Sequence, residues 1–490
     1  MRSLSAPHAR ADSSPQAEGS THQSTARAAQ LSPEAAQRIV MALMVPSMLM
    51  PIASGMSRVA LPIIRNDFGL TADMTAWVAT SYTLPFLILM PVYGRLSDGV
   101  GRRRLLLVGM CIFAVGTALT LSTTSLAWLM VGRAIQGIGT AGITPLGMAI
   151  ISAIFRAEER GKALGTWSSI GPTAAAIAPP TAGLLVDWGG WRLAFAPPLL
   201  LAVIAILVVA KVVPAGLSTV QPTFWRRFDW SGALLLGGAI TFLLFYLSSR
   251  PITGAEPLYD WRLLGITLLL LTVFLWWEGR RHAPFVPLGI FTNRMFTTAS
   301  CAAALRMITM AAGSFLVPLF LVDIYQMRAT TLGFMLMIMP GAMMMMVRFG
   351  GMLADRWDSR WPVMIGFVAQ IATMLLFSQV METTPLWLIG AFLVLHGLGV
   401  GLMLAALHRA AIQDVGEQQV GVAAGLYSML RFVGMATGTA LSGVILQSYT
   451  DQGLPLLNAY QASFRVFAFS ALLGLLVALI GFRTGNQLTQ

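Results

Sequence analysis

The fold of this chain is decided by the charged stretch Gly94-Arg95-Leu96-Ser97-Asp98-Gly99-Val100-Gly101-Arg102-Arg103-Arg104, which joins two long apolar runs. Its three glycines permit tight turns and close helix approach, and the Asp98 carboxylate can accept hydrogen bonds from helix-end N–H groups. A cluster of arginines beside apolar runs is typical of the cytoplasmic side of a membrane. The stretch therefore predicts a cytoplasmic loop between two membrane segments, and that loop orients the segments on either side of it.

The composition also indicates a membrane protein. Of the 490 residues, 56% are hydrophobic and only 11% are charged, and the mean hydropathy is +0.73. This is too little charge to cover the surface of a water-soluble protein of this length. The two cysteines, Cys111 and Cys301, lie alone in apolar runs, so neither a disulfide framework nor a metal site is expected, and no motif calls for a cofactor.

Fourteen apolar segments are long enough to cross a bilayer, which takes about 20 helical residues. Lipid offers no hydrogen bonds to an open backbone, so each segment is predicted to be a helix rather than a strand. The predicted spans are residues 39–63, 76–95, 104–122, 126–152, 164–186, 192–213, 230–249, 262–278, 296–320, 331–354, 362–380, 385–407, 420–446 and 462–482.

The basic residues orient these spans. Most of the 32 Lys and Arg residues fall in the N-terminal tail or in loops on one side, which the positive-inside rule assigns to the cytoplasm. Residues 1–36 lack apolar periodicity and a signal-peptide core, so they are predicted to form a disordered cytoplasmic tail. An even number of spans then places both termini in the cytoplasm, and the net charge of +12 marks orientation rather than nucleic-acid binding.

The opening stretch resembles the signature loop between helices 2 and 3 of the major facilitator superfamily, Gly-x-Leu-(Ala/Ser)-Asp-x-x-Gly-Arg-(Arg/Lys). A weaker copy, Gly351-Met352-Leu353-Ala354-Asp355-Arg356, looks like its partner in the other half of the chain. The resemblance implies an all-α integral membrane protein built from two six-helix bundles that are tandem repeats. It also implies a latch that holds the two halves in one state, formed by Gly94, Asp98, Gly101, Arg102 and Asp355.

A further stretch, Gly132-Arg133-Ala134-Ile135-Gln136-Gly137-Ile138-Gly139, resembles the Arg-x-x-Gln-Gly-x-Gly motif of the superfamily. Two others, Phe228-Asp229-Trp230-Ser231-Gly232 and Glu278-Gly279-Arg280-Arg281, resemble the 14-helix drug:proton antiporters within it. The resemblance implies two extra central helices between the bundles. The expected organisation is a tail over residues 1–36, an N-terminal bundle over 37–213, a linker with the two extra helices over 214–282, a C-terminal bundle over 283–484 and a cytoplasmic tail over 485–490.

Two motifs depart from the antiporter pattern. Helix 1 has Ala53 where the antiporters usually carry an aspartate, and helix 5 has Ala178-Pro179-Pro180-Thr181-Ala182-Gly183 in place of Gly-Pro-x-x-Gly-Gly. All 20 Asp and Glu residues fall in the tail, in loops or at span ends. A cavity with arginines and without a carboxylate favours anionic or neutral amphiphiles over cationic ones.

Arginines, in contrast, fall inside the spans, at positions 58, 133, 306, 348 and 431. A charge at a helix centre costs about 2.5 to 3.5 kcal/mol on insertion scales, so it is rarely kept without a partner or a watery cavity. Arg306, near the middle of helix 9, either faces a cavity or bonds backbone carbonyls, and Arg58 either faces the cavity or reaches the interface. Arg133 matches the superfamily motif in which the arginine is tied to proton transfer.

Two other side-chain types are candidates for the site. His396 lies in mid-helix 12, where it either carries a transported proton or packs as a neutral ring. Helix 10 is rich in methionines, including Met335, Met339 and Met343. These flexible side chains either line a pocket that accepts many shapes or face the lipid.

The expected function is that of a proton-coupled secondary transporter that exports amphipathic small molecules by alternating access, and the alternative is a proton-coupled importer of an organic anion. No Walker A, His-Glu-x-x-His or Gly-x-Ser-x-Gly pattern is present in the sequence, so an ATPase or another enzyme is not expected. The expected location is the inner membrane. The expected partners are the substrate, protons and lipid, and the resemblance leaves room for a periplasmic adaptor and an outer-membrane channel.

Overall fold

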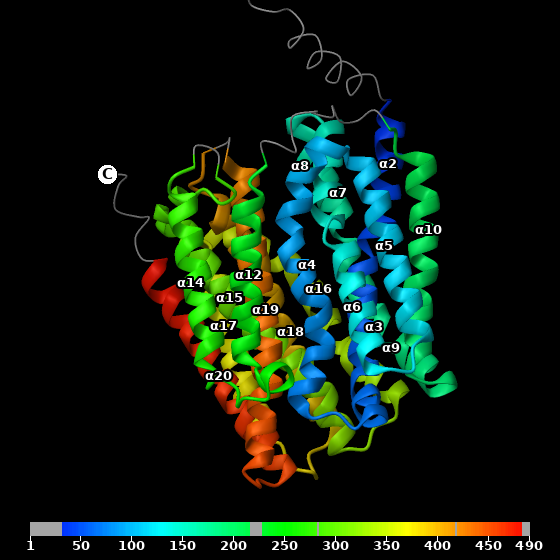
Figure 1. Cartoon of the computed structure of the whole chain (residues 1–490), viewed down its shortest axis with the longest axis vertical. Coiled ribbons are helices and arrows are strands. Elements are labelled where there is room, and N and C mark those ends of the chain that lie inside the picture. The colour runs from blue at the N-terminus through cyan, green and yellow to red at the C-terminus, as the bar shows by residue number, and fades with distance from the viewer. Residues whose placement is uncertain (1–31, 216–227, 282–283, 417–418, 483–490) are drawn as a thin grey trace, which may run out of the picture.

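The computed structural model describes residues 32–215, 228–281, 284–416 and 419–482, and these ranges contain helices and connections but no strand (Figure 1). Fourteen helical segments within them are long and apolar enough to cross a membrane. The prediction of an all-helical membrane protein with 14 spans is therefore confirmed.

The first six spans form one half of the molecule. Several of them are interrupted helices, because proline or glycine residues break the hydrogen-bond ladder. In chain order they are α2 (Pro33–Ser47) with α3 (Leu49–Phe68), α4 (Ala72–Val100), α5 (Arg102–Ser122), α6 (Leu126–Thr140) with α7 (Ile143–Ile154), α8 (Ala157–Ser168) with α9 (Ile170–Gly189), and η1 (Trp191–Phe195) with α10 (Ala196–Val212).

Two spans follow before the second half begins. They are α12 (Trp230–Leu247) and α14 (Trp261–Glu278), joined by the short α13 (Arg250–Thr253). α12 and α14 pack on each other, and α12 also contacts α4 and α19. The second half consists of η2 (Leu288–Thr292), α15 (Arg294–Asp323), α16 (Ala329–Trp357), α17 (Arg360–Phe377), α18 (Leu386–Ile412), α19 (Val420–Asp451) and α20 (Leu456–Gly481).

The charged stretch at 94–104 is almost entirely helical, so the loop predicted there is wrong. α4 continues to Val100 and α5 begins at Arg102, which leaves Gly101 as the break. Gly101 has φ +94°, a conformation that side chains other than glycine rarely adopt. The arginines and Asp98 are compatible with a helix, so only this glycine stops it.

The N-terminal boundary also differs from the expectation. α2 begins at Pro33, inside the predicted tail 1–36, because proline is favoured at the first helical position and the Ser32 hydroxyl caps the helix. The Ser32 Oγ atom accepts a hydrogen bond from Ala35 N at 3.3 Å. Residues 1–31 and the predicted C-terminal tail at 485–490 lie outside the described residues.

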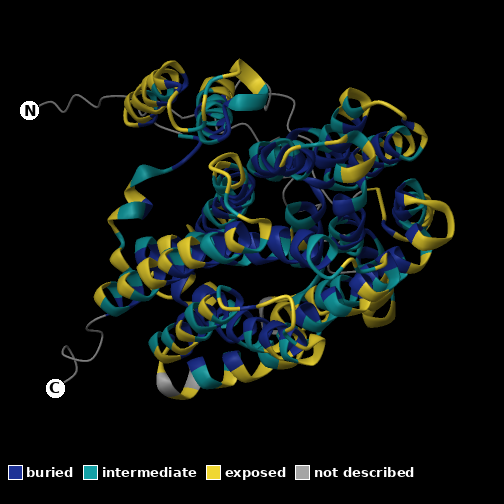
Figure 2. Ribbon diagram, turned by 90° about the horizontal axis from the view of Figure 1, so that it is seen from below, coloured by how far each residue is buried: buried dark blue, intermediate teal, exposed yellow. Residues whose placement is uncertain are grey.

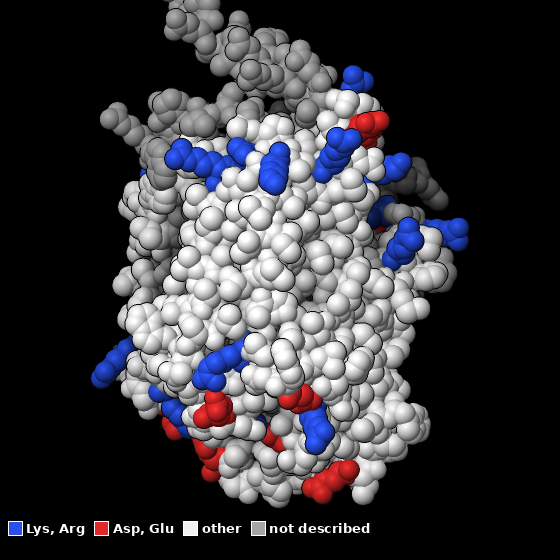
Figure 3. Space-filling view, turned by 90° about the vertical axis from the view of Figure 1, so that its right-hand side faces the viewer, with Lys and Arg blue, Asp and Glu red and all other residues white. Residues whose placement is uncertain are grey.

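The spans alternate in direction, so the molecule has two distinct ends. We name the end where α2 begins and α20 ends the terminal face, and the other end the opposite face (Figure 1). In Figure 3 the charged side chains near the terminal face are mostly basic, acidic and basic side chains lie together near the opposite face, and a band between them is free of charge over much of the visible side. This pattern matches a protein that crosses a bilayer.

Buried residues lie on the sides of the helices that face one another, and exposed residues lie on the outer sides (Figure 2). Many exposed positions are large and apolar, among them Leu234, Leu269, Trp276 and Ile480, as expected for surfaces that contact lipid. The two halves meet along two seams, α4 against α19 and α9 against α16. These seams enclose the site described next.

Candidate functional site

A cavity of about 90 Å³ lies between the two halves. α3, α4 and α6 of the first half supply most of its polar side chains, and α15 and α19 supply most of its methionines. The polar lining residues are Ser54, Ser57, Arg58, Tyr82, Thr83, Arg133, Ser314 and Thr439, and the apolar ones are Met50, Leu61, Ala79, Met307, Met310, Ala311, Phe315 and Met435. Two arginines and no carboxylate are present in this described lining.

A second, smaller space of about 20 Å³ adjoins this cavity, and we name it the side chamber. It shares Arg58 and Ser314 with the larger cavity. The rest of its lining comes from α15, α16, α17 and α18, namely Gly313, Val317, Leu336, Met339, Met374, Phe377, Leu393 and His396. Arg58 therefore lies where the two spaces meet.

Arg58 is held loosely by the protein. Its Nη2 atom lies 3.5 Å from the Ser54 hydroxyl, one helical turn earlier on α3, which is a long distance for a hydrogen bond. The side chain is half-buried. Its guanidinium is thus a charge that faces the cavities rather than one engaged by a fixed partner.

Arg133 is held firmly. It is only 2% exposed, its Nη1 atom donates to Gln136 Oε1 at 2.7 Å, and its guanidinium lies 4.6 Å from the centre of the Tyr82 ring. Gln136 in turn donates to Thr117 Oγ1 at 3.1 Å. The i, i+3 spacing of Arg133 and Gln136 brings them to one helix face. This spacing could have identified Gln136 as a site residue from the sequence, but only Arg133 was singled out from the motif.

Arg306 is buried in the wall of the second half. It is 1% exposed, it is absent from the lining of both cavities, and its Nε and Nη2 atoms have no hydrogen-bond partner among the described residues. Tyr427 and Arg431 of α19 are near enough to act on it electrostatically. Of the two alternatives for this residue, the structure shows neither a cavity-facing side chain nor a bond from these two nitrogens to a backbone carbonyl.

His396 lines the side chamber and is 2% exposed. Neither of its ring nitrogens has a hydrogen-bond partner in the part of the chain that the structure describes. Among the methionine candidates, Met339 lines the side chamber, whereas Met335 packs at the edge of the apolar core. Met343 brings its carbonyl oxygen close to Gly401, where an added Cβ would lie 2.6 Å away.

The residues of the expected latch lie at the terminal face. Arg102 donates from Nη1 to the carbonyl oxygen of Ala149 at 3.0 Å, and Gly94 packs near Pro145. The side chains of Asp98 and Asp355 lie outside the described part of the chain.

Arg95, which the motif comparison did not single out, makes a contact between distant segments. Its Nη2 atom donates to the carbonyl oxygens of Pro284 and Phe285, at 3.1 and 3.2 Å. These residues belong to the segment that leads into α15. The signature stretch of the first half is therefore tied to the entry of the second half.

Polar contacts join the two halves at the opposite face. Arg65 at the end of α3 forms a bidentate pair with Asp323 at the end of α15, and the Tyr460 hydroxyl donates to the same carboxylate. Sequence reasoning missed these residues, because 258 positions separate Arg65 from Asp323 and only their placement at helix ends hints that they share a face.

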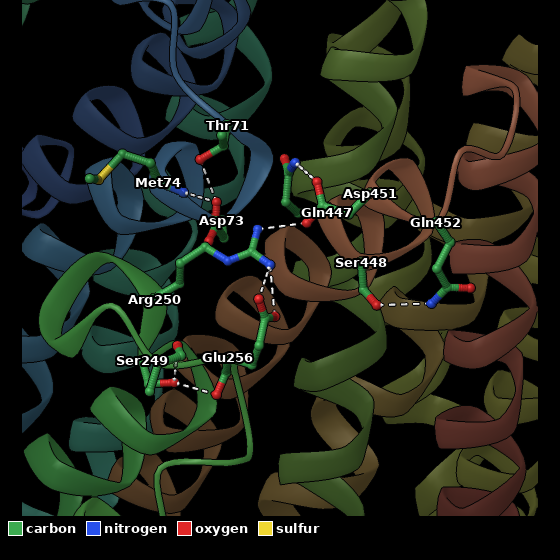
Figure 4. A network of polar contacts seen from close by, with 11 residues as sticks. Thr71, Asp73, Met74, Ser249, Arg250, Glu256, Gln447, Ser448, Asp451 and Gln452 are labelled. Atoms are coloured by element: carbon green, nitrogen blue, oxygen red, sulfur yellow. Dashed lines mark hydrogen bonds and ion pairs between the residues drawn. The ribbon is translucent and has the colours of Figure 1, made fainter.

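A second polar network lies nearby at the opposite face (Figure 4). Arg250 of α13 bonds to Asp451 at 2.6 Å and to Glu256 at 2.7 Å. Gln447 donates to Asp451 and accepts from the backbone N–H of Ala72, each at 2.8 Å. The connection between the two extra helices is thus linked to the seam of α4 and α19.

Comparisons with known proteins agree with this architecture. The chain is 28% identical over 414 residues to Multidrug resistance protein 3 of Bacillus subtilis, which covers 83% of this chain and 79% of that protein. It is 27% identical over 394 residues to the Riboflavin transporter RibZ of Clostridioides difficile, with 80% and 84% covered.

The fold matches the crystal structure of a bacterial homologue of the human lysosomal transporter Spinster, in an inward-facing and occupied conformation. The TM-score is 0.66 at 15% identity, with 93% of this chain and 98% of that chain covered. The family model described as Major Facilitator Superfamily matches residues 43–439 and 298–487. This chain is a membrane transporter and belongs to the major facilitator superfamily.

Proposed function

We propose that the protein is a proton-coupled secondary transporter that exports amphipathic small molecules, with anionic or neutral compounds preferred over cations. The observation that carries this proposal is the lining of the central cavity, in which Arg58 and Arg133 are the charged residues. Methionines and other apolar side chains cover the remaining wall. Such a site attracts a negative group at one end and accommodates varied apolar bodies at the other.

Export is supported by the name of the Bacillus subtilis relative, which refers to multidrug resistance. The basic terminal face supports an orientation in the inner membrane with both termini in the cytoplasm (Figure 3). Contact between the halves at the opposite face supports alternating access, in which Gly94, Asp98, Gly101, Arg102 and Asp355 act as the latch at the terminal face.

Proton coupling requires a group that titrates within the transport path. His396 is the candidate because it is buried, lines the side chamber next to Arg58 and has no fixed hydrogen-bond partner among the described residues. Arg133 is the second coupling candidate, not as a titrating group, because an arginine stays charged, but as a fixed charge that lines the cavity and is linked to Gln136 and Thr117. A periplasmic adaptor and an outer-membrane channel remain proposed partners.

The test is accumulation of matched anionic, neutral and cationic amphiphiles in inside-out vesicles driven by a proton gradient. Arg58→Gln is the informative variant, and Arg348→Gln is its control because Arg348 is exposed on α16. We expect anion accumulation that collapses with an uncoupler and falls about tenfold in Arg58→Gln, equivalent to about 1.4 kcal/mol, but not in Arg348→Gln. Preference for cations in the wild type would contradict the proposed substrate class.

Import of an organic anion is the second candidate function. The Clostridioides difficile relative, named a riboflavin transporter, is about as similar in sequence as the multidrug protein, so similarity alone does not select drug export over transport of another small molecule. Both functions use the same cavity and the same arginines. Accumulation in right-side-out vesicles, with none in inside-out vesicles, would favour import over export.

A further inference from the structure

The region around the two cavities carries arginines that no carboxylate of the described residues pairs with. Arg58, Arg133 and Arg306 lie within spans, and among the described residues none of them forms an ion pair with a carboxylate. The helices that line the side chamber carry acidic residues only near their ends, or none at all. Charges removed from water are costly unless they are paired, so this region calls for a negative partner.

The side chamber is the place where such a partner fits. Arg58 closes one side of it and the Ser314 side chain lies beside Arg58. His396 forms another part of its wall, nine-tenths or more buried and with both ring nitrogens unpaired in the described structure. Arg306 is near enough to His396 to act on it electrostatically. A negative particle in the chamber would therefore contact the cation Arg58 and lie beside a histidine on which the charge of Arg306 also acts.

The size of the chamber limits its occupant. Its volume is about 20 Å³, and one water molecule needs roughly 10 to 15 Å³ by the same measure. This leaves room for a single particle of about that size and excludes an organic acid. A water molecule would fill the space but leave the positive charge unbalanced, whereas a monatomic anion satisfies both requirements.

We propose that the side chamber formed by Arg58, Ser314, Gly313 and His396 binds a small inorganic monovalent anion of chloride size. The anion neutralises Arg58, accepts a hydrogen bond from the histidine ring and holds α3 against α15 and α18. This site adjoins the cavity that would take the transported molecule and shares Arg58 and Ser314 with it, whereas Gly313 and His396 line the side chamber and not the larger cavity. The proposal does not depend on the direction of transport.

A substitution at Gly313 can test the site with little disturbance of the fold. An added Cβ at this position would lie 3.6 Å from His396 Nε2 and 3.6 Å from the end of Met374, which is ordinary contact and compatible with folding. Gly313→Ala thus takes space from the side chamber, and Gly313 is not part of the larger cavity's lining. Gly341→Ala is the matched control, because it is the same change within a neighbouring span and has no atom within 4 Å of the added Cβ.

The experiment measures the melting temperature of the purified full-length protein in detergent against increasing sodium chloride, with sodium gluconate at equal ionic strength as the reference. We expect a rise that saturates in chloride and is absent in gluconate. Gly313→Ala should weaken the apparent chloride affinity by about tenfold or more, Arg58→Gln should abolish the chloride effect, and Gly341→Ala should keep it. Equal behaviour in chloride and gluconate, or a Gly313→Ala protein with wild-type chloride dependence, would overturn the proposal.

Discussion

The two ends of the contact between the halves are built differently. At the opposite face, glycines bring backbones together, so that an added Cβ at Gly183 would lie 2.3 Å from the carbonyl oxygen of Ala329. The buried pair of Arg65 and Asp323 reinforces this end. Near the terminal face, Gly425 of α19 has no atom within 4 Å of an added Cβ. At these positions the packing is therefore tight at the opposite face and open on α19 near the terminal face, as a transporter needs in one of its alternating states.

The largest expected effect comes from breaking the pair at the closed end. Asp323→Ala leaves the Arg65 guanidinium without its acidic partner, and the Tyr460 hydroxyl loses its acceptor. Because the two charged side chains are only 15% and 8% exposed, we expect a loss of about 3 kcal/mol from the closed state. The measurement is the thermal unfolding midpoint together with the labelling rate of a cysteine placed at the opposite face.

Asp323→Asn is the control for that change, since the amide keeps the shape and one acceptor oxygen. It should recover part of the lost stability. An unchanged midpoint and labelling rate in Asp323→Ala would mean that glycine packing, not the ion pair, closes the opposite face.

A pair of glycine substitutions in one helix compares the two ends directly. In α19 an added Cβ at Gly443 would lie 2.6 Å from the carbonyl oxygen of Ala72, whereas the same atom at Gly425 meets nothing within 4 Å. We expect Gly443→Ala to destabilise the protein by roughly 1 to 3 kcal/mol through overpacking. Gly425→Ala should stabilise it by up to about 1 kcal/mol, because alanine is the better helix former.

Thermal unfolding of both variants checks this prediction. Shifts of the same sign and size would show that the two ends of α19 are packed alike, which would remove the basis of the comparison.

The number and type of the helices could be predicted from sequence because bilayer thickness and backbone hydrogen bonding leave few alternatives. The break at Met48 and the helical course of residues 94–100 were not predicted, because proline, glycine and charged residues are each compatible with a helix as well as with a break, and the sequence does not tell which position interrupts the helix. The orientation of Arg306 was equally hidden. α15 is apolar nearly all round, so no periodic pattern tells which side of the helix faces the cavity.

The pairing across the halves was hidden for a different reason. Arg65 and Asp323 each end a span and look like ordinary interfacial charges in the sequence. Their meeting depends on how the two bundles are rotated against each other, which no local pattern records. The contact of Arg133 with Gln136 was easier to predict from the sequence, because the two residues are one helical turn apart.

An effect of intermediate size is expected from removing a helix cap at the opposite face. The Asp187 carboxylate, at the end of α9, accepts from the backbone N–H groups of Ala329 and Thr330 at 3.2 and 2.9 Å. These groups begin α16, so the carboxylate both caps that helix and meets its positive end. We expect Asp187→Ala to cost about 1 kcal/mol and Asp187→Asn to cost less, measured by thermal unfolding. A cost below that of a change at an exposed, unbonded acid would argue that α9 and α16 are held by glycine contacts alone.

The smallest effect is expected for the network of α13 in Figure 4. Hydrogen bonds to the carboxylates of Asp451 and Glu256 raise the pKa of Arg250 above its usual range, so the guanidinium stays charged at any working pH. The two ion pairs are partly exposed, with Glu256 66% and Asp451 42% accessible, and water and salt screen them. Arg250→Gln should therefore lower the free energy of unfolding by only about 0.5 kcal/mol at low salt. In high salt, thermal unfolding of the variant and the wild type should not differ measurably, because salt screens the same ion pairs in the wild type. A loss of about 2 kcal/mol or more would approach the cost of breaking a buried ion pair. It would mean that the two extra helices take part in closing the opposite face. The closed end would then include these two helices as well as the two bundles.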